Sequence, residues 1–329
     1  MTLLLRDHDV RALCDMPGMV EALQEGLRNE AKGPGAVLPE RMNLGHQDIF
    51  LRVMPVLLPE AGLMGLKFFQ GSMVKGVRYI VALSSLDSGE VIALLDSAYL
   101  TAARTGATSG VATRFMSRED SRTVGLIGSG LEAETNLEAV CSVRPIESVK
   151  VYSRSPERRA AFAGRMCDRL GVEITAAESA AEAVAGTDVV VVATNTGPDG
   201  ITAYHGVHLE PGQHVVSIGS TTLALREVDT ETFRRADVVV FDAEFSQIRQ
   251  ESGDVAALVR ETPSWGSAIG LNQLLTGSVL GRSAPEEITL FKSVGTAAQD
   301  LIGASYIVRE ARRRGGGTDV DEIASPKQF

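Results

Sequence analysis

The sequence has few of the features that mark disulfide-bonded, metal-binding or membrane proteins. It contains three cysteines, Cys14, Cys141 and Cys167, at spacings that fit no redox or metal motif. No apolar run reaches the roughly 18 residues that a membrane-spanning helix needs. The apolar start, residues 1–5, gives way to charged residues too early for the core of a signal peptide. We therefore expect a cytoplasmic protein with reduced thiols.

Positive charge is also scarce. The formal net charge is −10, and no basic stretch is interleaved with aromatic residues, so nucleic acid is not an expected partner. Arg309, Arg312, Arg313 and Arg314 do cluster before Gly315, which predicts a cationic helix end at that glycine. The five histidines form no pair at the helical spacing of metal ligands. We expect neither a bound metal nor a membrane partner.

Glycine, by contrast, is plentiful, and residues 123–133 place it in an informative order. They read T-V-G-L-I-G-S-G-L-E-A, an apolar run followed by a G-x-G-x-x-A turn and a helical segment. Gly128 permits the tight turn, Gly130 lets the backbone approach a pyrophosphate, and Ala133 keeps the helix close to the sheet. A second apolar run ends at Tyr152, as a dinucleotide-binding βαβ unit requires. The expected phosphate-binding residues, with the amides of the helix N-terminus, are Gly128, Gly130, Leu131 and Glu132.

The residues after the second run indicate which nicotinamide cofactor is used. An enzyme that selects NAD usually has Asp or Glu there, to accept a hydrogen bond from the ribose 2′-hydroxyl. This sequence has Ser153, Arg154 and Ser155, followed by Arg158. Hydroxyls and guanidiniums suit a 2′-phosphate. We expect NADP(H) to be preferred, with NAD(H) possible.

The rest of the chain predicts an α/β protein. Residues 17–31 have the periodicity of an amphipathic helix, and short apolar runs between 39 and 93 predict an antiparallel sheet. Residues 97–116 predict a helix with a surface of small side chains, against which another backbone or a ligand can come very close. From about residue 122, strands and helices alternate, and valine-rich runs suit a parallel sheet buried on both faces. A long helix from 296 to 314 is expected to return to the first domain.

The fold class predicted is therefore a Rossmann-type doubly wound parallel sheet inserted into an N-terminal α+β sheet domain that also receives the C-terminal helix. The predicted boundaries are 1–113 plus 297–329 for a substrate-binding and dimerisation domain, and 114–296 for the dinucleotide-binding domain. A ligand is expected in the crevice between them, outside the carboxyl ends of the parallel strands.

Several further segments together resemble the ornithine cyclodeaminase/μ-crystallin family along nearly the full length of the chain. Residues 100–107 (L-T-A-A-R-T-G-A) are similar to the family's L-T-A-x-R-T-x-A segment, and 291–300 contain its F-K-S-x-G-x-x-x-x-D signature. L-D-S-G at 86–89 and the following Asp96 are similar to two of its other elements. The resemblance implies a homodimer formed through the N-terminal sheet domain, a Rossmann domain that binds the cofactor, and substrates that are amino acids or their cyclic imines.

The resemblance also implies individual roles. By position, the substrate-contacting residues correspond to Arg41, Lys67 and Arg104, the pyrophosphate contact to Thr105, and the nicotinamide side to Thr194, Asn195 and Ser293. The chemistry of the residues agrees, because guanidiniums can hold the planar carboxylate of an α-imino acid in a bidentate manner. Burial of Lys67 beside Arg41 and Arg104 would lower its pKa and make proton transfer near neutral pH easier. The segment Gln70–Met73 departs from the family's patterns and is a candidate to shape specificity.

One departure from the family bears on the reaction. Ornithine cyclodeaminases have a G-x-D-x-P-G-K-x-E segment whose Asp is the proposed acid/base, whereas residues 219–227 read G-S-T-T-L-A-L-R-E. Thr221 takes the place of that Asp, and a hydroxyl cannot act as a base at neutral pH.

The leading hypothesis is therefore an NADPH-dependent reductase of cyclic or open-chain α-imino acids, such as Δ1-pyrroline-2-carboxylate. The alternatives are an ornithine or lysine cyclodeaminase, reductive amination as in alanine dehydrogenase, and a non-catalytic protein that binds NADPH and a small ligand. The candidate catalytic residues are Lys67, Arg41, Arg104 and Thr221.

Overall fold

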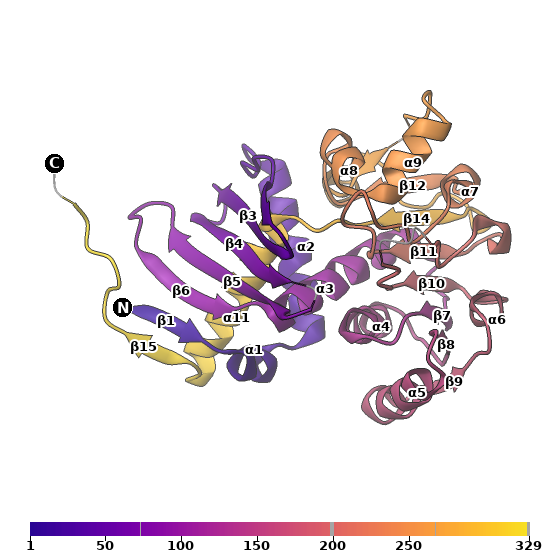
Figure 1. Cartoon of the computed structure of the whole chain (residues 1–329), viewed down its shortest axis with the longest axis horizontal. Coiled ribbons are helices and arrows are strands. Elements are labelled where there is room, and N and C mark those ends of the chain that lie inside the picture. The colour runs from indigo at the N-terminus through magenta and orange to yellow at the C-terminus, as the bar shows by residue number, and fades with distance from the viewer. Residues whose placement is uncertain (73, 198–200, 267, 328–329) are drawn as a thin grey trace. The chain divides into compact units, whose positions relative to one another are not determined.

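A computed structural model describes residues 1–72, 74–197, 201–266 and 268–327 of the chain. Met73, the last residue of the segment singled out above, lies outside them. Backbone contacts divide the chain into two compact units (Figure 1): unit 1 comprises Met1–Arg104 with Thr296–Phe329, and unit 2 comprises Thr105–Gly295. Among the described residues, no helix has both the length and the apolar character needed to cross a membrane.

Unit 1 contains a seven-stranded mixed sheet. Its strands are β1 (Thr2–Leu5), β2 (Met42–His46), β3 (Ile49–Leu58), β4 (Leu63–Ser72), β5 (Gly76–Ser85), β6 (Val91–Asp96) and β15 (Thr318–Val320). The strand order is β15-β1-β6-β5-β4-β3-β2. Strands β2 to β6 form the predicted antiparallel meander, with the turn at Asp87–Glu90 between β5 and β6. The sequence did not predict that β1 would pair in parallel with β6 and in antiparallel with β15.

Helices within the described residues complete unit 1. They are α1 (Asp7–Leu13), α2 (Met16–Lys32), α11 (Ala297–Arg314) and the start of α3 (Ala98–Met116). Helix α11 packs against α2 and against β3, β4 and β5, so the C-terminal helix joins the N-terminal sheet as predicted. It begins at the N-cap Thr296, whose side chain accepts a hydrogen bond from the amide of Gln299, and ends at Gly315 in the left-handed conformation. Arg312, Arg313 and Arg314 lie in its last turn, which confirms the cationic helix end.

The sheet of unit 1 has two different faces because side chains alternate along each strand. Lys67 pairs with Met54 and Val81, and all three side chains are buried on the face that the helices cover. Their neighbours in sequence point the opposite way, and apolar residues such as Leu66 and Ile80 remain partly exposed there. Lys67 is therefore buried by its register position, since a shift of one residue would expose it.

Unit 2 contains an eight-stranded parallel sheet. Its strands are β7 (Thr123–Ile127), β8 (Ser148–Tyr152), β9 (Glu173–Ala176), β10 (Val189–Val192), β11 (His214–Ser217), β12 (Val238–Phe241), β13 (Ile269–Gly270) and β14 (Thr289–Lys292). The order is β13-β12-β14-β11-β10-β7-β8-β9, and every pairing is parallel. The chain order reverses between β7 and β10, which makes the sheet doubly wound and confirms the predicted fold class.

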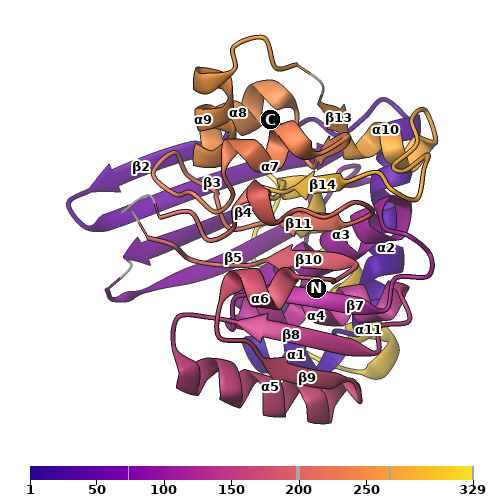
Figure 2. The ribbon, with the colours of Figure 1, turned by 90° about the vertical axis from the view of Figure 1, so that its right-hand side faces the viewer.

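In the part of unit 2 that the structure describes, helices and a 3₁₀ turn connect these strands. They are α4 (Leu131–Val143), α5 (Pro156–Leu170), α6 (Ala180–Val184), η1 (Gly206–His208), α7 (Thr230–Arg235), α8 (Phe245–Glu251), α9 (Gly253–Glu261) and α10 (Leu271–Thr276). Figure 2 shows α5 beside β8 and β9 at one end of unit 2, and α8 and α9 at the other. These elements confirm the alternation of strands and helices predicted from about residue 122.

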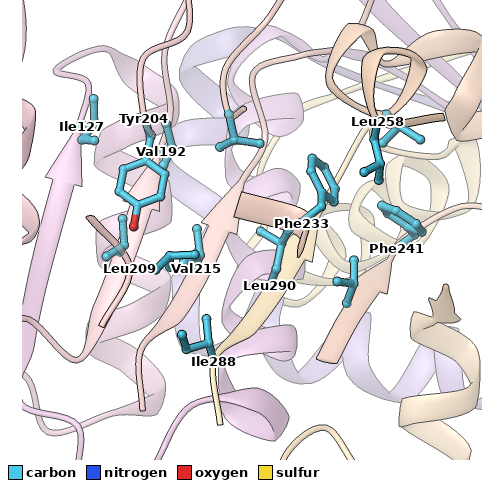
Figure 3. Close-up of a cluster of buried hydrophobic side chains, with 14 of the residues drawn as sticks. Ile127, Val192, Tyr204, Leu209, Val215, Phe233, Phe241, Leu258, Ile288 and Leu290 are labelled. Atoms are coloured by element: carbon cyan, nitrogen blue, oxygen red, sulfur yellow. The ribbon is translucent and has the colours of Figure 1, made fainter. Parts of the chain in front are cut away.

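An apolar layer holds the central strands of unit 2 together. It includes Val192 of β10, Val215 of β11, Leu290 of β14 and Phe241 of β12, all of which are almost completely buried (Figure 3). Fully burying one such side chain contributes about 1.5–3 kcal/mol. Because the four strands share this layer, the loops at their carboxyl ends start from fixed positions.

Candidate active site

A buried cluster of charged side chains lies on the helix-covered face of the sheet in unit 1. Lys67 of β4 donates to Asp300 Oδ1 of α11 across 3.0 Å, and Arg104 Nε of α3 donates to the same oxygen across 2.8 Å. Arg104 Nη1 also donates to Gln299 Oε1 across 3.0 Å. Lys67 is 2% exposed, Arg104 5% and Asp300 0%. The structure thus brings two of the three predicted substrate-contacting residues together on one carboxylate.

The third residue, Arg41, precedes β2 and lies close enough to act electrostatically on Lys67. Burial lowers the pKa of the Lys67 ammonium to about 8, and the positive charges of Arg104 and Arg41 contribute to the lowering, while Asp300 opposes it. Burial alone would raise the pKa of Asp300, but Arg104 and Lys67 outweigh it and hold that pKa below its ordinary value. Lys67 and Arg104 therefore share one carboxylate, and Arg41 adds positive charge beside Lys67, which is a favourable setting for a further anion.

Aromatic rings form one side of the Lys67 environment. The ammonium lies 5.5 Å from the ring centroids of both Phe69 and Tyr79, which stack on each other at 4.8 Å. Such a position stabilises a desolvated cation. Asp300 Oδ2 accepts no hydrogen bond from any described residue, so the cluster keeps one buried acceptor oxygen.

The glycine turn of unit 2 has the geometry expected of a dinucleotide site. Gly128 has a φ of +127°, and a Cβ on it would lie 2.1 Å from the carbonyl oxygen of Ala193, so no other residue fits there. Gly130 caps α4 in an extended conformation, and a Cβ on it would meet no atom within 4 Å. Leu131 and Glu132 follow as the first helical residues, with their amides at the positive end of the helix dipole. These features fit a pyrophosphate.

Thr105, the predicted pyrophosphate contact on α3, is 7% exposed. The next residue, Gly106, lies against the backbone of α4, since a Cβ there would be 2.3 Å from the carbonyl oxygen of Thr135. The small-residue surface of α3 therefore does admit another backbone, as the sequence predicts.

The predicted ribose-side residues follow β8 and begin α5. Ser153 Oγ accepts a hydrogen bond from Ser129 Oγ, and Ser155 is the N-cap of α5, with its side chain accepting from the amide of Arg158. The Ser155 hydroxyl also donates to Glu157 Oε2 across 2.8 Å. Arg154 donates to the carbonyl oxygen of Asn195 across 3.4 Å, which brings this loop against the loop that follows β10.

The predicted nicotinamide-side residues are held by two buried or half-buried carboxylates that sequence reasoning did not assign. Glu227 Oε1 accepts from both the amide and the hydroxyl of Thr194, at 2.8 and 3.0 Å. Asp242 accepts from the Ser293 hydroxyl at 2.6 Å and from two amides that follow it. Thr221 lies half-buried in the loop after β11, in the same unit as these residues and not in the unit of Lys67.

Two signals in the sequence could have revealed part of this arrangement. Asp300 ends the F-K-S-x-G-x-x-x-x-D signature and Lys292 is its second residue, yet the motif alone gave neither a role. Glu227 ends the segment in which Thr221 replaces the family's Asp. Asp242 carries no motif, and only its place after a buried strand could have indicated it. Within the described residues, no group of three or more His, Cys, Asp or Glu side chains is arranged to hold a metal ion.

The chain is similar to known proteins along most of its length. The chain matches the family described as the ornithine cyclodeaminase/mu-crystallin family over residues 1–315. It is 36% identical over 279 residues to a Delta(1)-pyrroline-2-carboxylate reductase of Bacillus cereus, covering 84% of this chain and 82% of that protein. Among solved structures, the Delta(1)-pyrroline-2-carboxylate reductase of Thermococcus litoralis in complex with NADH and L-proline aligns with a TM-score of 0.90 and 33% identity, covering 97% of this chain and 100% of that one. An archaeal alanine dehydrogenase dimer with bound NAD aligns with a TM-score of 0.87 and 29% identity, covering 97% and 99%.

Proposed function

The chain belongs to the ornithine cyclodeaminase/mu-crystallin family, as its motifs predict, and from this premise we propose that it reduces the C=N bond of cyclic or open-chain α-imino acids. It is an NAD(P)-dependent oxidoreductase that acts on C=N or CH–NH bonds. The proposed substrate is Δ1-pyrroline-2-carboxylate or a related imine, in agreement with the names of the relatives at 36% and 33% identity. The observation that carries the proposal is the excess of buried cations around Lys67 and Asp300.

The substrate carboxylate would bind at this cluster. The guanidiniums of Arg104 and Arg41 offer paired donors to its two oxygens, and Lys67 adds a third donor. With a pKa of about 8, Lys67 can hold a proton at neutral pH and release it near that pH to the substrate nitrogen. Asp300 Oδ2 is an acceptor for an N–H of the imine or amine. When bound, the nicotinamide cofactor supplies the hydride, and the protein supplies orientation and charge.

Thr221 favours net reduction over cyclodeamination. Cyclodeamination must oxidise, cyclise, eliminate ammonia and reduce again, and it calls for an acid/base where this chain has a hydroxyl. Reduction of a preformed imine needs one hydride and one proton, which the residues around Lys67 can support.

NADP(H) is the proposed preferred cofactor, and NAD(H) remains usable. Arg154 and Arg158 are exposed at the start of α5, and the position after β8 carries a serine in place of a carboxylate. The solved relatives named above hold NADH and NAD, which supports a nicotinamide cofactor of either kind. We assign the cofactor to residues 114–296, and the substrate and dimer contacts to 1–113 with 297–329.

A homodimer through the sheet of unit 1 is part of the proposal. The exposed apolar side chains of β2 and β3, Met42, Leu44, Ile49 and Leu57, share the face opposite Lys67. A pocket of about 400 Å³ opens among residues that include Leu44, Ile49, Leu51 and Arg78, and Lys67 does not line it. An apolar surface of this kind is typical of an interface. Light scattering should give twice the 35.0 kDa chain mass, and a charge at Leu44 should reduce that value.

The deciding experiment is steady-state oxidation of NADPH and NADH with Δ1-pyrroline-2-carboxylate and Δ1-piperideine-2-carboxylate. We expect turnover with at least one imine and a higher kcat/KM with NADPH. Proline and ammonia formed from ornithine would favour the cyclodeaminase, and oxidation with pyruvate and ammonia alone would favour the alanine dehydrogenase activity. Tight NADPH binding without turnover of either imine would contradict the proposal and favour a ligand-binding protein.

A further inference from the structure

Glu227 makes more contacts with backbone amides and hydroxyls than its place in a loop would suggest. It is 1% exposed. Its Oε1 holds the amide and hydroxyl of Thr194, after β10, and its Oε2 accepts from the Ser217 hydroxyl at 2.7 Å and from the amide of Gly219 at 2.6 Å, after β11. One carboxylate therefore joins the ends of two adjacent strands.

A second layer fixes the carboxylate itself. Lys292, at the end of β14, donates to the Ser217 hydroxyl at 3.0 Å, and its ammonium lies 3.1 Å from Asp254 and 3.8 Å from Glu227. Asp254 in turn accepts from the amide of Glu227 at 2.8 Å. Lys292 and Asp254 are fully buried, so their ion pair is shielded from solvent, while the partly exposed Arg226 also lies 3.6 Å from Asp254.

The close approach of the two loops requires a glycine. A Cβ on Gly219 would lie 2.3 Å from Glu227 Oε1 and 2.4 Å from the carbonyl oxygen of Thr194. Its φ is not in the left-handed region, so the requirement comes from space and not from backbone conformation. The contacts of Glu227 therefore depend on two positions in the sequence, Glu227 itself and Gly219, eight residues earlier.

Sheet topology tells which part of the cofactor these loops face. In a doubly wound sheet the dinucleotide lies across the carboxyl edge at the point where the strand order reverses, here between β7 and β10. The ribose-reading segment follows β8 on one side of that point. The loops after β10 and β11 lie on the other side, which is that of the nicotinamide half.

We propose that Glu227 is a positioning residue that fixes the nicotinamide half of the cofactor by holding the loops after β10 and β11 in register. It does so through Thr194 and Gly219, without touching the reacting atoms. The inference rests on the proposed use of a nicotinamide cofactor, and it adds a residue that neither the motifs nor the relatives' names assign to the site.

The test compares Glu227→Gln with wild type in two measurements. Gln keeps the size of the side chain but turns an N–H₂ toward donors that need an acceptor. We expect kcat for imine reduction to fall about 10- to 100-fold, because small misplacements of reacting groups have effects of that size. The dissociation constant of NADPH should change little, since the adenosine and pyrophosphate contacts remain. In saturation-transfer NMR with NADP⁺, the nicotinamide protons should lose signal relative to the adenine protons.

Asp188→Asn is the matched control. Asp188 also accepts two backbone amides, from Arg122 and Thr123, but it lies at the amino ends of the same strands, beside β7 and β10. We expect this variant to lose stability while keeping the wild-type kcat and the wild-type ratio of nicotinamide to adenine signal. A Glu227→Gln variant that behaves like the control would overturn the inference.

If Glu227→Gln does not fold, Ser217→Ala replaces it in the test, because it removes one hydrogen-bond donor to the Glu227 carboxylate. A wild-type ratio of nicotinamide to adenine signal in Ser217→Ala would overturn the inference. If wild type reduces no imine but the signal ratio still falls in Glu227→Gln, the proposed function fails and the positioning role stands.

Discussion

Among the described residues, Lys67 and Lys292 are both buried, and their surroundings differ in a way that separates a binding group from a structural one. Lys67 in unit 1 has one carboxylate and two guanidiniums acting on it, and its pKa is lowered to about 8. Lys292 in unit 2 lies within 3.8 Å of two carboxylates and donates to a hydroxyl. Both are at most 2% exposed. Burial therefore does not distinguish their roles, whereas the balance of charge around each one does.

The balance of charge has a physical consequence. Lys292 and Arg226 together balance Glu227 and Asp254, so that cluster needs no further ion and stabilises the fold as one network. The cluster around Lys67 has surplus positive charge, and its cations repel one another until an anion binds. Part of the free energy of substrate binding comes from relieving this repulsion. Substitutions at Lys292, Arg104 and Lys67 test this contrast, and one at Arg154 tests the choice of cofactor.

Lys292→Met should have the largest effect, because it removes the fully buried cation between Glu227 and Asp254 and leaves the partly exposed Arg226 beside Asp254. We expect a loss of about 3–5 kcal/mol in the free energy of unfolding at neutral pH, measured by urea denaturation. Burial raises the pKa of Glu227, with Lys292 opposing. A carboxyl whose pKa is raised in the folded state stabilises the fold at low pH, and this stability is lost as pH rises through that pKa. Removing Lys292 raises the pKa of Glu227 further. The deficit relative to wild type should therefore shrink on acidification.

The control for this prediction is Lys150→Met, since Lys150 is an exposed lysine on β8 that contacts one carbonyl oxygen. It should change stability by no more than about 0.5 kcal/mol. Equal effects of the two substitutions would mean that the network around Lys292 is not a unit.

Arg104→Ala breaks the cluster in unit 1. We expect kcat/KM for the imine to fall about 100-fold or more, the effect of losing a charge-assisted pair with the substrate carboxylate. Arg104→Lys should recover only part of the loss, because a lysine keeps the charge but not the paired donors. A near-wild-type kcat/KM in Arg104→Ala would remove Arg104 from the site.

The titration of Lys67 gives a smaller, pH-dependent effect. Its lowered pKa means that the ammonium is lost as pH rises through about 8, so kcat/KM should fall about tenfold per pH unit above that value. In Lys67→Arg the side chain stays charged above pH 8. The inflection near pH 8 in the plot of kcat/KM against pH should then disappear, while any inflection caused by ionisation of the substrate should remain. The same inflection in both proteins would assign it to another group.

Arg154→Ala should have the smallest effect, since its guanidinium is exposed. We expect the ratio of kcat/KM with NADPH to that with NADH to fall about tenfold, the effect of one lost charge-assisted contact with a phosphate. Arg165→Ala, on the helix that follows and paired with Glu134, is the matched control and should leave the ratio unchanged. Equal losses with both cofactors would contradict a role for Arg154 in reading the 2′-phosphate.

The sequence predicted the fold closely where local pattern decides the structure. The strand–turn–helix from Thr123 to Val143, the small-residue helix α3 and the C-terminal helix each have a periodicity or a cap that residues close in sequence create. The partners of the two lysines were not predictable in this way. Lys67 meets Asp300, which is 233 residues away, and only the register of β4 and the packing of α11 bring them together.

The same limit applies to Glu227. A motif marked its position, but an acid in a loop of mixed composition carries no local sign that it is buried. Its burial follows from the sheet order, in which β14 lies between β11 and β12 and delivers Lys292 beneath the loop. The sequence contained the residues of both clusters, and the topology decided which of them meet.

The tight fit at Gly219 also bears on how this enzyme can be re-engineered. Any side chain at that position would displace the carbonyl oxygen of Thr194, so this part of the loop after β11 tolerates no variation. Thr221 to Ala224, which begin only two residues further, have half-buried or exposed side chains. Randomised libraries in this loop should therefore begin at Thr221 and leave Gly219 fixed.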